Sequence, residues 1–215
     1  MWAAPTIYVC SWRRFFLRSV IHRTLRFVVP LLFLWPFSAK AGVIDFEGLS
    51  DGTAVTTQYS GLTFLNGIIL TSGISLNEFE FPPHSGSNVV SDDGGALSIL
   101  FNSPVTNVSA YLTYSVPVTL TALDSQGHQL GFIMSIFSSN LTLSGQPGSS
   151  PNELLQVSFD TPIVNVTFTG DAAGGSFALD DLTYTVATSG VPEPHCLWLV
   201  AGGLSILILK RKIRP

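Results

Sequence analysis

The basic residues of this chain are confined to its two ends. No Lys or Arg occurs between Gly42 and Gly190, whereas all 14 acidic residues except Glu193 lie in that interval. A domain folded from these residues therefore contains no Lys or Arg ion pair. Basic groups at both ends with none between are what the positive-inside rule predicts for an exported middle. Nucleic-acid binding is disfavoured because phosphate contacts need Lys or Arg.

Residues 42–188 are predicted to form one all-β domain. Short runs rich in Val, Ile, Thr, Phe and Tyr are separated by clusters of Gly, Pro, Asn, Asp and Ser, and no long amphipathic helix pattern occurs. Several such runs at short spacing favour an antiparallel β-sandwich or barrel. The expected strands are Val43–Phe46, Ile68–Thr71, Leu97–Phe101, Val105–Thr113, Val118–Leu123, Leu130–Phe137, Leu154–Phe159, Ile163–Thr169 and Phe177–Thr185.

Two stretches of this domain resemble each other. Leu97–Ser109 and Leu155–Thr167 both read as strand, Asn/Asp-Ser/Thr-Pro and returning strand. Because proline suits a turn and cannot continue a central ladder, Pro104 and Pro162 predict two similar hairpins. A third hairpin is expected around Asp124-Ser-Gln-Gly127.

Residues 1–41 are predicted to be an export leader. A basic region precedes the apolar run 27–37, and Ala39-Lys-Ala41 offers the small-x-small pattern that signal peptidase cleaves. The mature chain is then expected to begin at Gly42. Two alternatives stay open: translation could start later, near Val20, and Arg13-Arg14 resembles a twin-arginine motif, although the general secretory route is favoured.

The C-terminal 25 residues combine three features. Val191-Pro192-Glu193-Pro194 is expected to be extended, because proline disfavours helix in the residue before it. The run 196–209 is uncharged and predicts a membrane helix, although its length also allows a core helix. A basic cluster that resists crossing the membrane follows, formed by Lys210, Arg211, Lys212 and Arg214.

This order of motif, apolar helix and basic end resembles the PEP-CTERM sorting signal of Gram-negative bacteria, carried by Val191–Pro194 and Lys210–Lys212. The resemblance implies recognition by an exosortase, a membrane protease/transpeptidase. It places the chain in the inner membrane before processing and at the cell surface or outside afterwards. The segments Ile44–Leu49 and Phe177–Leu182 resemble the jelly-roll-like sandwich domains common in such proteins, which are akin to carbohydrate-binding modules.

The best candidate for a cofactor is a structural calcium ion. In an antiparallel sandwich the first and last strands can be neighbours, which would bring Asp45 and Glu47 near Asp180 and Asp181. Calcium prefers carboxylate and carbonyl oxygens, and no basic residue is available to compensate these acids. The alternative is that the four acids face water or cap turns.

These features favour a structural or adhesive envelope protein without enzymatic activity. The second hypothesis is a non-catalytic module that binds exopolysaccharide, although all four Trp residues lie outside the domain. The third, a secreted glycoside hydrolase, would need paired carboxylates such as Glu78 and Glu80. Those two acids are expected on a half-buried strand, and His84 and His128 in solvated loops.

Overall fold

The structure, a computed structural model, describes residues 41–187, which form ten strands and no helix. Within these residues no helix is able to cross a membrane, and residues 1–40 of the predicted leader and the predicted helix 196–209 lie outside them. The strands are β1 (Ala41–Ile44), β2 (Ala54–Val55), β3 (Leu62–Leu65), β4 (Gly67–Thr71), β5 (Asn88–Asp93), β6 (Leu97–Tyr114), β7 (Thr119–Leu123), β8 (Gln129–Met134), β9 (Glu153–Thr169) and β10 (Gly174–Val186).

Two long strands, β6 and β9, organise the sheet. They pair antiparallel along their length, from Leu97 opposite Phe168 to Leu112 opposite Glu153. The predicted pair of separate hairpins is therefore wrong: the two similar stretches are two continuous strands that pair with each other. The ladder shifts register between Leu100 and Asn107, where Pro104 lies, so the prolines occupy bulges in the ladder.

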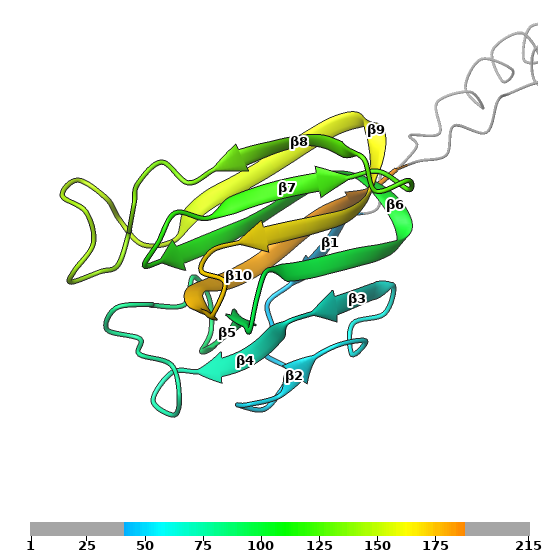
Figure 1. Ribbon diagram of the computed structural model, residues 1–215. Helices are drawn as coiled ribbons and strands as arrows, with labels where there is room; N and C mark the ends of the chain where they lie inside the picture. Colours follow the sequence, from blue (N-terminus) through cyan, green and yellow to red (C-terminus); the bar gives the residue numbers. More distant parts are fainter. Residues whose placement is uncertain (1–40, 188–215) are drawn as a thin grey trace, which may run out of the picture. The chain divides into compact units, whose positions relative to one another are not determined.

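All ten strands belong to one antiparallel sheet, in the order β2-β4-β5-β10-β6-β9-β7-β8, with β1 on β10 and β3 on β6. The first half of β6 and the second half of β9 lie with β3, β7 and β8. The other halves of β6 and β9 lie with β10, β5 and β1. Figure 1 shows β7, β8 and β9 on one side and β2, β3 and β4 on the other.

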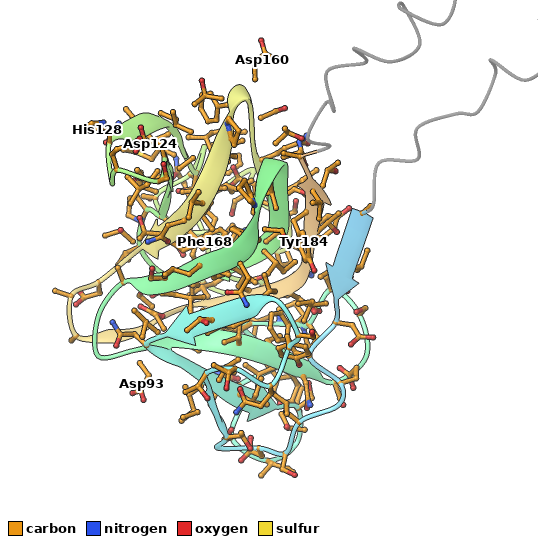
Figure 2. All side chains as sticks on the ribbon, turned by 90° about the vertical axis from the view of Figure 1, so that its right-hand side faces the viewer. Asp93, Asp124, His128, Asp160, Phe168 and Tyr184 are labelled. Carbon is orange, nitrogen blue, oxygen red and sulfur yellow. The ribbon has the colours of Figure 1, made fainter. Side chains whose placement is uncertain are left out.

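The main hydrophobic core takes side chains from both groups of paired strands, the one with β3 and β7 and the one with β1, β5 and β10. Phe64 of β3, Leu112 of β6, Leu120 of β7, Phe168 of β9 and Leu179 of β10 belong to one cluster and are fully buried. In Figure 2 Phe168 lies inside the domain, whereas the labelled acids Asp93, Asp124 and Asp160 lie at its periphery. Alternate residues are buried along most strands, and the all-β antiparallel architecture predicted from the sequence is confirmed.

The hairpin predicted at Asp124–Gly127 is confirmed. It joins β7 to β8, and the Asp124 carboxylate accepts the N–H groups of Gln126 and His128. Gly127 has φ +79°, a conformation that suits glycine. Three strands, β2, β3 and β5, were not predicted. β5 was missed because its sequence does not alternate between apolar and polar residues. A strand alternates in this way when only one face is buried, whereas β5 is buried on both faces.

Both faces of β5 are buried because the loop 72–87 crosses the sheet. Leu76 and Phe81 of this loop pack against Leu70 of β4, Val89 of β5 and Ala178 of β10, on the face opposite the main core. Residues 77–80 form a turn rather than the predicted half-buried strand. The same loop continues to His84 and brings it against the strands that carry the candidate site.

Candidate binding surface

The candidate site is built around a bulge in β10. Asp180 pairs with Tyr111 of β6, the register shifts, and pairing resumes at Thr183 opposite Ser109. Asp181 occupies the bulge with φ +47°, a left-handed conformation that Asp tolerates better than most residues. β10 pairs with β5 before the bulge and with β1 after it. The bulge therefore opens a gap between β5 and β1, and the loop 82–87 is anchored there.

The carboxylates of Asp180 and Asp181 hold this loop. Asp180 Oδ2 accepts the backbone N–H of both His84 and Ser85 at 2.8 Å. Asp181 Oδ1 accepts the Ser85 hydroxyl at 2.9 Å, and its Oδ2 lies 2.6 Å from His84 Nδ1. Glu47, just beyond β1, accepts the N–H groups of Ser87 and Asn88 at 2.8 and 2.7 Å. The three acids therefore fasten one loop at successive residues.

The predicted neighbourhood of the first and last strands is confirmed, because β1 pairs with β10 from Ala41–Thr185 to Ile44–Leu182. The predicted calcium-binding role does not follow from it. Within residues 41–187, no three His, Cys, Asp or Glu side chains form a group that could hold a metal ion. Glu47, Asp180 and Asp181 accept hydrogen bonds from loop 84–88, and the carboxylate of Asp45 accepts the N–H of Glu47 at 3.3 Å.

Backbone N–H groups also satisfy carboxylates elsewhere in the domain. Buried Asp92 accepts the N–H of Ser176 at 2.8 Å, and Glu80 accepts that of Leu143 at 3.0 Å. The Leu143 N–H holds the pKa of Glu80 below its usual range. Among residues 41–187, the acids that lie close to a basic side chain are Asp181, beside His84, and Asp124, beside His128. Backbone donors thus take the role that Lys and Arg have in other domains.

Burial and charge also shift the pKa values of two groups at this end of the sheet. Burial raises the pKa of Asp180 to about 6, and the neighbouring charge of Asp181 adds to the shift. The N–H donors of Ser85, Asp181 and His84 act against it, because they favour the ionised carboxylate. Burial, with the charges of Asp45 and Glu47, raises the pKa of Tyr59 to about 12.

The ring of His84 lies flat on the ring of Tyr111. Their centroids are 3.5 Å apart and their planes differ by 6°. The Asp181 carboxylate fixes His84 on one side, while about 35% of the His84 side chain stays exposed. The sequence placed His84 in a loop correctly, but it gave no sign that the ring packs on a sheet. The result is a rigid and partly open aromatic surface.

A strip of neutral polar side chains continues from this aromatic pair. Side chains opposite one another on adjacent strands share a face, so the register defines two rows. Thr183, Ser109 and Gln156 form the first row, and Thr185, Asn107 and Ser158 form the second. All six are half-buried or exposed. We call these six residues the polar strip.

The polar strip can make hydrogen bonds in both directions. Each hydroxyl and each amide offers a donor and an acceptor, and none carries a charge. Tyr111 and His84 border the strip at one end. Val43 of β1, which is 65% exposed, borders it on the side of Thr183. Sequence reasoning missed it because its residues come from three strands. Only the alternation of Asn107, Ser109 and Tyr111 along one strand hinted at a polar face.

The remaining predicted residues lie at or beyond the described ends. Ala41 is exposed and begins β1, whereas Ala39 lies outside the described residues. The sorting motif and the basic cluster also lie outside them: Val191, Pro192, Glu193, Pro194, Lys210, Arg211, Lys212 and Arg214.

A hollow of about 280 Å³ occurs where β1 starts, lined by residues that include Gly42, Phe101 and Tyr184. Figure 2 shows Tyr184 beside this strand.

A scan against protein-family models finds no match, and a search of curated proteins finds none either. Among solved structures, the chain is similar to the K2 cleaved adhesin domain of Lys-gingipain, with 16% identity and a TM-score of 0.46. That match covers 68% of this chain and all of the other. It is also similar to a family 29 carbohydrate-binding module from Piromyces equi, with 11% identity, a TM-score of 0.39, and 72% and 95% coverage. Both likenesses are distant and carry no functional argument.

Proposed function

We propose that this chain is an exported, non-catalytic protein with a structural or adhesive role that it exerts by binding neutral polysaccharide on the polar strip. The observation that carries the proposal is the position of the strip beside the stacked rings of His84 and Tyr111. Ligand sites combine apolar or aromatic surface with a few well-placed polar groups. A sugar ring has both requirements, because it presents apolar C–H faces and a rim of hydroxyls.

Charge selects the class of polysaccharide. Between Gly42 and Gly190 the chain has no Lys or Arg, and Asp181 lies next to the His84 ring. An acidic polymer would be repelled there, whereas a neutral one meets uncharged hydroxyl and amide groups beside the aromatic pair. The hydrolase hypothesis loses the strand that was expected to pair Glu78 with Glu80, because both lie in a turn and Glu80 accepts the N–H groups of Leu143 and Ser144.

The proposal keeps the processing route expected from the sequence. The leader would be removed after Ala41, and an exosortase would act at Val191–Pro194 after the helix 196–209 has held the chain in the inner membrane. The domain would then be released or attached at the cell surface. The jelly-roll-like arrangement of its two layers is part of the same proposal.

Binding is tested with the fragment 42–188 on an array of neutral and acidic polysaccharides. His84→Ala removes the aromatic ring but keeps the backbone N–H that Asp180 accepts, and Gln156→Ala removes one amide of the strip. The matched controls are His128→Ala and Gln126→Ala, at the far hairpin. Loss of one hydrogen bond should weaken binding about two- to tenfold. Equal binding by all four variants, or a preference for acidic polymers, would contradict the proposal.

A further inference from the structure

The strand β8 leaves one side of its backbone without a partner strand. It pairs with β7 on one side, and no strand among residues 41–187 pairs with the other. Ser135 donates its N–H towards the β7 side, to Val118 O at 2.9 Å. Backbone groups alternate in direction along an antiparallel strand, so those of Phe132 and Met134 point to the open edge.

The side chains along this edge are apolar and exposed. Phe132 is 60% exposed, Ile133 38% and Met134 53%, and Ile136 just beyond the strand is 80% exposed. Edge strands of soluble proteins usually carry a charge, a proline or a covering loop that prevents further pairing. The segment 129–136 has no charge and no proline. Another strand with one paired side, β3, differs, because Phe64 of β3 donates its N–H to Thr56 O, just beyond β2.

We propose that β8 pairs with β8 of a second copy of this chain, antiparallel and about a twofold axis at Ile133. The charge distribution favours a second copy at this place. The domain is acidic throughout, so two copies repel each other except where acids are missing, and the sequence is uncharged from Gln129 to Asn152. The apolar edge is therefore the surface on which two copies can meet without opposing like charges.

The sequence of β8 is self-complementary in this register. Ile133 would lie opposite Ile133 of the second copy, and Phe132 opposite Met134 in both directions. Phe132 and Met134 are the residues whose backbone groups point outward, so each such pair can exchange two hydrogen bonds. Each pair also places a methionine sulfur against an aromatic ring, which is a favourable contact. Pairing ends at Ser135, because the N–H of Ile136 is donated to Glu153 Oε1.

Cysteine cross-linking of the full chain tests this pairing. Both native cysteines are first replaced, by Cys10→Ser and Cys196→Ser, and one cysteine is then introduced by Ile133→Cys. Residues opposite each other across strands lie within disulfide reach, so mild oxidation should give a covalent dimer. The control Ser125→Cys, in the exposed hairpin turn, should stay monomeric. Equal dimer from both variants would overturn the proposal by showing random collision.

The register is tested with two differently tagged copies in the same cells. Phe132→Cys in one copy and Met134→Cys in the other should cross-link, whereas either variant alone should not, because its cysteines are then diagonal. Adding Met134→Glu to the Ile133→Cys chain should abolish the dimer. The matched control is Leu65→Glu, which changes a residue of equal exposure on β3. If Ile133→Cys cross-links to a different protein, or binds lipid and gives no covalent dimer, a second copy is excluded as the partner.

Discussion

The buried carboxyl group of Asp180 should make the domain less stable as pH rises through 6. Its pKa is about 6 in the folded protein, against an ordinary value of 3.8. Because the folded pKa is raised, the fold favours the neutral acid. The stabilisation from this group is complete below about pH 4 and is lost as pH rises through about 6. At about 1.4 kcal/mol per pKa unit, the change between pH 4 and pH 7 amounts to about 2 to 3 kcal/mol.

The variant Asp180→Asn isolates this contribution. Its amide oxygen can accept the N–H groups of His84 and Ser85, but its NH₂ faces the N–H of Asp181, which Asp180 Oδ1 accepts at 2.7 Å in the wild type. One unsatisfied donor costs about 1 to 3 kcal/mol, so the variant should be less stable at pH 4. Between pH 4 and pH 7 its disadvantage should shrink by about 2 to 3 kcal/mol, because asparagine does not ionise.

The assay is urea unfolding of the fragment 42–188 at half-unit steps from pH 4 to pH 7.5. Asp160→Asn, which removes an exposed acid of β9, controls for the overall loss of negative charge. Its curve shows how much of any pH dependence comes from the loss of one negative charge alone. A constant difference between wild type and Asp180→Asn across the whole range would refute the reasoning, since it would mean that Asp180 ionises alike in the folded and unfolded chains.

Three further outcomes are expected. Asn140→Ala should lower the free energy of unfolding by about 3 kcal/mol or more, because fully buried Asn140 accepts the Tyr114 N–H and donates to Leu112 O and Ser150 O. In the same urea assay, Asn107→Ala in the half-buried polar strip should lower it by less than about 1 kcal/mol. Millimolar CaCl₂ should raise the Tm no more than NaCl of equal ionic strength, because the oxygens of Glu47, Asp180 and Asp181 already accept hydrogen bonds; a larger rise that a chelator reverses would restore the calcium hypothesis. Mass spectrometry of the mature protein should find a C-terminus near Val191–Pro194, and recovery of the intact Arg214 end would speak against exosortase processing.

Local sequence signals predicted local structure well. The Asp124–Gly127 turn, its two flanking strands and the burial of alternate residues follow from turn chemistry and hydrophobic period. The similarity of Leu97–Ser109 to Leu155–Thr167 corresponds to two long strands that pair with each other, not to two local hairpins. Pro104 and Pro162 suggested turns, whereas both lie within long strands at bulges. Bulges depend on the partner strand, which no pattern within one strand specifies.

The candidate site shows the same division. Sequence reasoning brought Asp45 and Glu47 next to Asp180 and Asp181, since the first and last strands of a sandwich can pair. It assigned them a metal because it lacked their actual partners. For Glu47, Asp180 and Asp181 those partners are groups of residues 84–88, and His84 is 96 residues before Asp180 in the sequence. The stacking of His84 on Tyr111 and the rows of the polar strip depend on the same distant pairing.

The sequence by itself determined that this domain has to satisfy its carboxylates without Lys or Arg, because those residues are missing from Gly42 to Gly190. It also determined that the chain folds into strands, because its apolar residues recur with the period of a sheet. Only the tertiary structure decided which backbone N–H groups meet which acids, where the polar strip forms and that β8 keeps an open edge. Those features arise from residues far apart in the chain, and they depend on the register of the paired strands, which burial of the core specifies.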